Sequence, residues 1–213
     1  MGGPPARLSA LGVATGLSHM DMAFAVSGGE LPRDHSFALW QALAQAAPWL
    51  GEDDTVAVLP IRAASAGGDR LVVQRHSRLL MRLREARVEA ALALSGRRLE
   101  VAGAALTLGE AKTRPLVAHA TLYAHRVATA DDAGGLWPGE ADFVEQVKRE
   151  LALLEVRSDF IVGRPSRTRG PAGDVAGYSL MLAELPARQS IVLQVAGIGA
   201  HRRLGFGIFV GHK

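Results

Sequence analysis

A glycine-rich basic segment around residue 200 has the residue types needed to bind an anion. Closely spaced glycines allow positive φ values and a close approach of the backbone to a ligand. Successive amides in such a loop form a concave anion site, and arginine guanidiniums add permanent charge with planar geometry. The sequence therefore predicts that residues 197–207 form a loop that binds a phosphate backbone. The candidate contacts are Gly197, Gly199, His201, Arg202, Arg203, Gly205 and Gly207.

Two other glycine-rich sites do not fit this segment. A dinucleotide fingerprint needs a third glycine three residues after the second, where this chain has Arg202. A P-loop needs Gly-Lys-Ser or Gly-Lys-Thr, which the segment lacks. A structural alternative stays open, namely a tight hairpin between two terminal strands whose arginines are only solvated.

His35 is the histidine whose position best suits proton transfer. It directly follows Asp34, a good N-cap residue, and so is expected in the first turn of a helix. That end carries free N–H groups and a partial positive charge, which favour a nearby anion and a neutral imidazole. A neutral imidazole beside a phosphate can take or donate a proton. Arg33 and Ser36 flank it as candidate supports, and the alternative is a set of polar residues at an exposed helix start.

The histidine and cysteine content argues against a metal site. The chain has seven histidines and no cysteine, and it contains no His-Glu-x-x-His or His-x-His pattern. We therefore expect no metal and no cofactor. The lack of cysteine also excludes disulfides and suits a cytoplasmic protein. No apolar run approaches the ~20 residues of a membrane span, so no membrane partner is expected.

Basic charge is concentrated in the last quarter of the chain. The net charge is +3 over 213 residues, but residues 157–213 contain eight Lys or Arg against three Asp or Glu. This asymmetry predicts polyanion binding there, with solubility as the simpler alternative. Aromatic residues make up only 5%, so recognition through phosphates and shape fits better than base stacking. Further candidate contacts lie in a predicted basic loop and are Arg164, Arg167 and Arg169.

The spacing of apolar residues predicts an α+β protein. Over residues 20–110 the predicted order is β-α-β-β-α-β, which is the ferredoxin-like order. A helix capped by Asp34 carries Leu39 and Leu43 at helical spacing and ends near Gly51. The other predicted elements are strands at 20–27, 55–61, 71–74, 78–83 and 99–108 and a short helix at 87–94.

The second half approximately repeats this order. Its predicted elements are strands at 116–127, 159–163 and 177–185, a helix at 141–154, and a basic loop at 164–170. The segments 190–196 and 206–210 flank the glycine-rich loop, and no second helix is visible. The predicted fold is therefore two tandem ferredoxin-like (RRM-like) domains, residues 20–114 and 115–213, with a C-terminal glycine-rich loop. Residues 1–19 are predicted to be a disordered leader.

Two motifs resemble a known family. The ending Gly197-x-Gly199-x5-Gly205-x-Gly207 on a tandem ferredoxin-like chain resembles the RAMP superfamily of CRISPR-associated proteins. The stretch Leu31-Pro32-x-Asp34-His35, followed by Leu39 and Pro48-Trp49-Leu50, is similar to the repeat-RNA endoribonucleases of that superfamily. These form the Cas-six family, and the stretch is also similar to its myxobacterial-type branch. The resemblance covers most of residues 20–213.

The resemblance implies a function. Members of this family cut a long precursor transcript within each repeat without a metal, using a ribose 2′-OH as nucleophile and leaving a 2′,3′-cyclic phosphate. It implies that His35 is the general base or general acid, and that Arg202 or Arg203 stabilises the developing charge. The implied partners are the precursor CRISPR RNA repeat and other subunits of an effector complex, for a protein that is a monomer or a weak dimer.

Two departures from the family pattern and two alternatives stay open. Several members pair the histidine with a tyrosine or lysine, but this chain has no lysine before Lys112. The arginine-rich helix of some members is also absent, which moves the expected RNA contacts to residues 164–169. The first alternative is a non-catalytic RAMP subunit that binds guide RNA in an effector complex. The second is a small-molecule regulator or enzyme built from paired ferredoxin-like domains.

Overall fold

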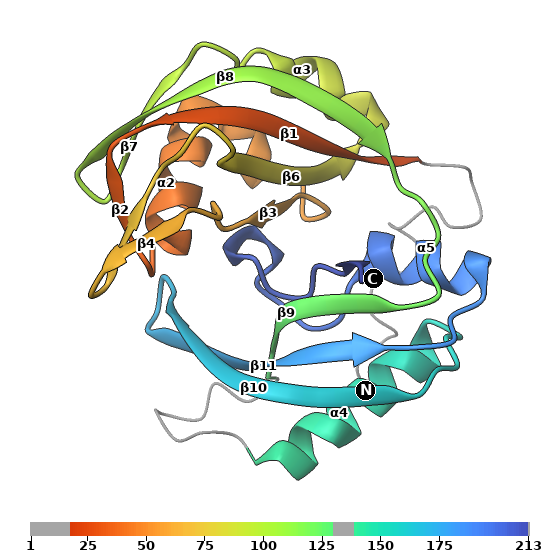
Figure 1. Cartoon of the computed structure of the whole chain (residues 1–213). Coiled ribbons are helices and arrows are strands. Elements are labelled where there is room, and N and C mark those ends of the chain that lie inside the picture. The colour runs from red at the N-terminus through yellow and green to blue at the C-terminus, as the bar shows by residue number, and fades with distance from the viewer. Residues whose placement is uncertain (1–17, 130–138, 213) are drawn as a thin grey trace.

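The computed structural model describes residues 18–129 and 139–212. Two larger antiparallel sheets lie one above the other (Figure 1), the first built before residue 116 and the second after it. The strands are β1 (His19–Gly28), β2 (Glu30–Pro32), β3 (Ala57–Leu59), β4 (Ala64–Gly67), β5 (Arg70–Val72), β6 (Arg78–Arg84), β7 (Arg98–Val101), β8 (Ala104–Pro115), β9 (Leu122–Ala128), β10 (Phe160–Arg169), β11 (Asp174–Leu182) and β12 (Val210–Gly211). The helices are α2 (Ser36–Ala46), α3 (Val88–Leu92), α4 (Glu140–Leu153) and α5 (Ala187–Ala196), with 3-10 turns η1 (Pro48–Gly51), η2 (Glu85–Arg87) and η3 (Arg202–Leu204).

The first sheet confirms the predicted ferredoxin-like order. Its strands run β3-β6-β1-β8-β7, and every neighbouring pair is antiparallel. The predicted strand 99–108 is two strands, because Ala102 and Gly103 adopt positive φ and form the turn between β7 and β8. β1 begins at His19, inside the predicted leader, and residues 1–17 of that leader lie outside the described residues. Strands β2, β5 and β4 form a separate small sheet.

The start of α2 differs from the prediction. The helix begins at Ser36 with His35 as its N-cap residue, and no side chain caps it. Asp34, the predicted N-cap, instead accepts hydrogen bonds from Thr168 Oγ1 and the Arg169 amide, each at 2.9 Å. The carboxylate is therefore used to join the first half of the chain to β10, a contact that local sequence could not reveal.

The second sheet also confirms the ferredoxin-like order, as β10-β11-β9-β12. The segment 190–196 lies in helix α5, which the sequence did not reveal because Ile191, Val192 and Val195 favour strands. The predicted basic loop 164–170 is also wrong in type. Strand β10 runs through it to Arg169, and the turn of the β10–β11 hairpin follows it.

Strand alternation gives the first sheet two different buried faces. Val58 of β3 belongs to the core that α2 and α3 cover, whereas its neighbours Ala57 and Leu59 pack with Ile208 of the C-terminal segment. The second sheet has its own core against α4, with Phe143 and other apolar residues. The C-terminal segment therefore fills the space between the two halves. In the described part of the chain, no helix has the length and apolar character needed to cross a membrane.

Arg82 makes a buried polar link between the two halves. It lies on β6 and is 1% exposed. Its guanidinium pairs with both carboxylate oxygens of Asp21, at 2.6 and 2.9 Å. It also donates to Gln194 O at 2.9 Å and to Phe209 O at 2.8 Å, both in the second half. Arginine suits this place because its rigid fork can serve a carboxylate and two carbonyls together.

Replacing Arg82 should destabilise the whole molecule. Arg82→Met leaves Asp21 and two buried carbonyls without their donor, so we expect a loss of about 3–5 kcal/mol in the free energy of unfolding. The matched control is Arg78→Met on the same strand, where the exposed side chain donates to the nearby Arg75 and Ser77 carbonyl oxygens and the expected loss is about 1 kcal/mol. Urea unfolding of both variants measures the difference, and equal losses would contradict a special role for Arg82.

Candidate nucleic-acid interface

The four glycines of the C-terminal loop adopt the predicted positive φ values. These are +69° at Gly197, +74° at Gly199, +88° at Gly205 and +65° at Gly207. All four are buried. A Cβ on Gly197 would overlap the carbonyl oxygen of Gly207, and a Cβ on Gly207 would overlap that of Ile198. The loop is therefore a tight crossing of two chain segments inside the protein.

Several amides of this loop also bind inside the protein. The Gly207 amide donates to Arg126 O at 2.8 Å, and the Gly199 amide donates to Glu150 Oε2 at 2.7 Å. The Gly197 amide closes the last turn of α5. These three amides are occupied inside the protein, so the predicted cradle of glycine amides around a phosphate stays a prediction that requires them to leave these partners. The close approach that glycine permits here is between backbone and backbone.

Arg202 holds the end of helix α5. Its Nη1 donates to the carbonyl oxygens of Val195 and Ala196, which are among the last carbonyls of the helix and favour a cation. Its predicted role as an RNA contact therefore competes with a structural role that the geometry shows directly.

Arg203 connects the loop to the first half of the chain. Its Nη2 donates to Gly51 O at 3.0 Å and pairs with Asp54 Oδ1 at 2.9 Å. Its guanidinium also lies 5.0 Å from the ring centre of Trp40, within the range of a cation–π interaction. His201 of the same loop is exposed and has a φ of +61°. Of the loop's three predicted side-chain contacts, His201 is the most open to solvent.

His35 is buried, with an exposure of 1%. Its Nδ1 lies 2.9 Å from Pro32 O, and its Nε2 accepts the Ile61 amide at 3.0 Å. Because a carbonyl only accepts and an amide only donates, the ring is neutral and carries its proton on Nδ1. Burial lowers the pKa of His35 below its usual range, and the charge of Arg126 lowers it further. The predicted neutral imidazole is present, but burial is the main cause.

The three predicted catalytic residues do not converge on a surface. Both ring nitrogens of His35 are occupied, so its proton-transfer role stays a prediction that requires the ring to leave Pro32 and Ile61. Ser36 is 3% exposed. Arg33 is exposed but turns to the small sheet, where Nη2 donates to Ser65 Oγ at 3.2 Å.

The predicted contacts of the basic loop lie on strand β10. Arg164, Arg167 and Arg169 are all exposed. Since β10 is an edge strand of the second sheet, it presents these arginines along an open border. Charged residues on an edge strand also discourage pairing with another sheet. This protective effect is the structural alternative to binding a polyanion.

Arg126 joins this border to the glycine-rich loop. Its Nη1 donates to Thr168 of β10, and its guanidinium lies 5.4 Å from the ring centre of Phe206. Its carbonyl oxygen accepts the Gly207 amide. Strands β9 and β10 and the loop are therefore fixed relative to one another.

A group that the sequence did not single out as a site lies between the two halves. It consists of Arg62, Tyr123, His125 and His212, which we call the His125 cluster. Arg62 follows β3 and donates through Nη2 to Nε2 of His125 on β9. The Tyr123 ring meets His125 edge-on at 4.8 Å and lies 5.6 Å from His212, between ring centres. The even spacing of Tyr123 and His125 places both on one face, but nothing local predicts Arg62.

The environment of His125 keeps its ring neutral. Burial, the charges of Arg62 and Arg126, and His212 together lower the pKa of His125 to about 4. The side chain nevertheless reaches solvent. His125 is therefore an accessible imidazole that lacks a proton on Nε2 at neutral pH.

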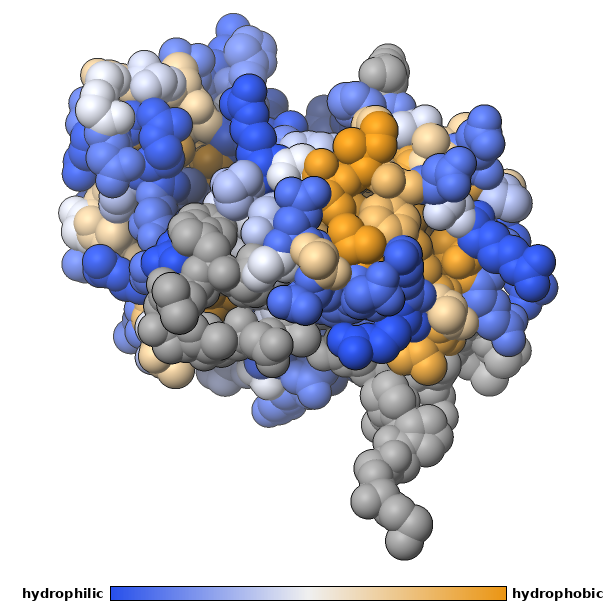
Figure 2. Space-filling view, turned by 90° about the horizontal axis from the view of Figure 1, so that it is seen from below, coloured by the Kyte–Doolittle hydropathy of each residue, from blue (hydrophilic) through white to orange (hydrophobic). Residues whose placement is uncertain are grey.

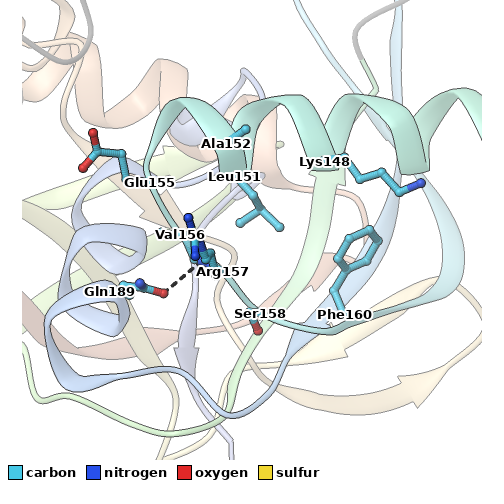
Figure 3. A pocket seen from close by; sticks show the side chains of 9 residues that line it. All are labelled: Lys148, Leu151, Ala152, Glu155, Val156, Arg157, Ser158, Phe160 and Gln189. Atoms are coloured by element: carbon cyan, nitrogen blue, oxygen red, sulfur yellow. Dashed lines mark hydrogen bonds between the residues drawn. The ribbon is translucent and has the colours of Figure 1, made fainter.

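A hollow lies elsewhere, where α4 meets α5 and the start of β10. Its volume is about 760 Å³, and Figure 3 shows the Arg157 amide bonded across it to Gln189 Oε1 at 2.9 Å. None of the predicted site residues lines it.

The molecule seen from below, in Figure 2, has a hydrophobic patch among hydrophilic residues. Leu153 of α4 and Ile161 of β10, which are 52% and 62% exposed, belong to elements on this side.

The fold and its glycine-rich crossing define the class of protein. The solved structure of a "CRISPR associated protein Cas6" has a TM-score of 0.65 at 13% identity, covering 92% of this chain and 99% of that chain. "An RAMP protein binding different RNA substrates" has a TM-score of 0.63 at 13% identity, covering 91% and 100%. These likenesses confirm the tandem ferredoxin-like fold of the RAMP proteins.

The chain belongs to the Cas6 family, because the family model described as "Cas6 Crispr" matches residues 20–213. The "CRISPR-associated endonuclease Cas6" of Myxococcus xanthus (strain DK1622) is 34% identical over 194 residues. That alignment covers 90% of this chain and 80% of the relative. Within residues 18–129 and 139–212, no three His, Asp or Glu side chains converge as a metal site would require.

Adding a methyl group to the glycine crossing should be costly. Gly207→Ala would force a Cβ into the carbonyl oxygen of Ile198 at a φ of +65°, so we expect a loss of at least about 1–3 kcal/mol. Gly29→Ala is the matched control, since a Cβ there meets nothing within 4 Å. Urea unfolding measures both. A Gly207→Ala protein as stable as Gly29→Ala would contradict the tight crossing.

His35 should contribute to stability, and the contribution should depend on pH. His35→Ala leaves Pro32 O and the Ile61 amide unpaired, at about 1–3 kcal/mol each. Because folding lowers the pKa of His35, the unfolded state binds its proton more readily and stability falls as the pH drops through the usual histidine range.

Urea unfolding at about pH 7.5 and about pH 5.5 tests this on either side of the usual histidine pKa. Wild type should lose more stability on acidification than His35→Ala. The low pKa of His125 acts in the same direction in both proteins and largely cancels. His76→Ala, at an exposed histidine, serves as control. Equal losses in wild type and His35→Ala would contradict a buried neutral His35.

Proposed function

We propose that this protein is an endoribonuclease that cuts precursor CRISPR RNA within its repeats. The observation that carries the proposal is the Cas6 family match over residues 20–213, together with 34% identity to a relative named as a CRISPR-associated endonuclease. The cut uses the ribose 2′-OH next to the scissile phosphate, needs no metal, and leaves a 2′,3′-cyclic phosphate. We expect it to act in the cytoplasm, which the lack of cysteine suits.

We propose that the RNA follows the basic border of the second domain. Arg164, Arg167 and Arg169 are exposed and all lie within residues 164–169 of β10. A phosphate chain can pair with such a row through charge-assisted hydrogen bonds. His201 adds an exposed polar group from the loop. In this proposal residues 20–114 and 115–213 are the two domains, and Arg202 and Arg203 contribute charge while they hold the loop.

The chemistry needs a proton acceptor near the 2′-OH and cations near the phosphate. An intramolecular 2′-OH is already placed beside the phosphorus, so positioning supplies much of the rate. Cations stabilise the extra negative charge of the pentacoordinate phosphorane. His35, the predicted proton-transfer group, can serve only if its ring leaves both backbone partners.

Cleavage of the cognate repeat RNA in EDTA tests the proposed function. We expect wild type to cut a single site and to leave a 2′,3′-cyclic phosphate end, which mass spectrometry identifies. A substrate with one 2′-deoxy at the cut site should bind equally well and remain uncut, because it lacks the nucleophile. The triple variant R164A/R167A/R169A should bind more weakly, with a shallower dependence of affinity on salt.

The possible results separate the candidate functions. Binding without any cutting would favour a guide-RNA-binding subunit. If the protein cuts only when a divalent metal is added, the proposed metal-free chemistry is wrong, but repeat RNA remains the substrate. If the protein neither binds nor cuts the repeat RNA, the proposed function is wrong. An unchanged salt dependence in the triple variant would restrict the β10 arginines to protecting the sheet edge.

A further inference from the structure

We propose that His125 accepts the proton of the ribose 2′-OH and that Arg62 binds the scissile phosphate. The inference rests on the proposed function and gives it a reacting centre. Arg62 comes from the first half of the chain and His125 from the second, and both are exposed. RNA that reaches this junction would therefore contact both residues together. None of the residues predicted from the sequence combines an exposed imidazole with a guanidinium in direct contact.

The hydrogen bond between them fixes the state of the imidazole. A guanidinium can only donate, so Nε2 of His125 must offer its lone pair to Arg62. A phosphate is a better partner for Arg62, because an arginine–phosphate pair is charge-assisted on both sides and often bidentate. When a phosphate takes Arg62, the lone pair of Nε2 is released beside that same phosphate. The substrate thus uncovers the base.

The charges around His125 allow a bound phosphate to raise the pKa of its ring. Arg62 and Arg126 are cations, His212 is a second imidazole, and Tyr123 contributes its ring edge. In the free protein this environment holds the pKa of His125 at about 4, too low for an effective base at neutral pH. The negative charge of a bound phosphodiester opposes the nearby cations and raises that pKa towards the working pH. Base strength therefore increases where and when substrate is present.

The step balances without any further reactant. The 2′-oxygen forms a bond to phosphorus while the bond from phosphorus to the 5′-oxygen breaks. The 2′-OH proton passes to Nε2 of His125, and the departing 5′-oxygen takes a proton from water. Arg62 stays on the phosphate oxygens, where charge grows in the transition state.

His35 and Gly205 act as positioning residues for Arg62. The Ile61 amide, next to Arg62 in the chain, donates to Nε2 of buried His35 at 3.0 Å. On the other side Gly205 lies so close to Pro60 that a Cβ would be 2.5 Å from its Cδ. The histidine motif and the glycine-rich loop thus hold the segment that carries Arg62, although neither reaches the phosphate in this arrangement.

Single-turnover cleavage of repeat RNA tests the assignment. His125→Gln keeps an acceptor for Arg62 but cannot take a proton, so the rate should fall about 10²–10⁴-fold with little change in affinity. Arg62→Ala should reduce both the rate and the affinity and lower the salt slope by about 1. The controls are His76→Gln and Arg75→Ala, a neighbouring exposed pair in the first half of the chain, and both should behave as wild type.

Titration of the His125 ring by NMR gives a readout that a structural role would not move. The ring should titrate at about 4 in the free protein. Its pKa should rise in Arg62→Ala, which removes a cation, and in wild type bound to uncut 2′-deoxy repeat RNA. If the pKa of His125 stays the same in Arg62→Ala and in the RNA complex, the contact with Arg62 and the release of the Nε2 lone pair by bound phosphate are both contradicted.

The outcomes separate this inference from the proposed function. If wild type cuts and His125→Gln cuts as fast as His76→Gln, the role of His125 is overturned while the function stands. If His35→Ala loses cleavage but keeps wild-type stability and an unchanged His125 titration, the proton-transfer role returns to His35. If wild type does not cut repeat RNA at all, the inference and the proposed function both fall.

Discussion

The two halves of this protein are held together by a buried arginine. Arg82 lies on β6, an inner strand of the first sheet, yet two of its hydrogen bonds go to carbonyl oxygens of the second half. A buried guanidinium is tolerated only when its charge and donors are matched, and Asp21 supplies the charge. Gln194 and Phe209, the residues that accept from it, precede and follow the glycine-rich loop. The interaction therefore sets where that loop sits between the sheets, and much of the candidate site depends on that placement.

Most of the glycine, arginine and histidine residues predicted to form the site instead hold this placement. Gly197 and Gly207 cross at backbone distance, Arg202 closes α5, and His35 ties Pro32 to Ile61. Each of these groups has the type expected of a binding or catalytic residue, but each already has partners inside the protein. Burial explains the difference, since a buried polar group must be satisfied within the fold. Groups that remain open to solvent, such as the β10 arginines and the His125 cluster, are better placed to meet RNA.

The arrangement also gives a physical reason for a two-domain architecture in this family member. The first half supplies Arg62 and the second supplies His125, so the proposed reacting centre exists only when both sheets are docked. Asp34 reinforces the docking through Thr168 and Arg169 of β10. In that proposal nearby cations keep the base neutral, and the charge of the phosphate it acts on raises its pKa, so uncharged ligands would not activate it. Docking, substrate binding and proton transfer are thereby linked through a few hydrogen bonds.

Local pattern in the sequence was enough to predict the α+β class, the ferredoxin-like order of the first half, the strands of the second half approximately, helix α4 and the positive φ values of the four glycines. It failed at α5, whose β-branched residues favour strands although tertiary packing makes them helical, and at β10, where polar arginines were taken for a loop. The candidate site was harder to predict from the sequence, because the burial of a side chain and the choice of its partners depend on residues far away in the chain. The sequence by itself determined that His35, the glycines and the arginines were present at suitable spacing. Only the tertiary structure decided that His35 would be enclosed and that Arg62 would meet His125, since that contact joins residues 63 positions apart on separate sheets.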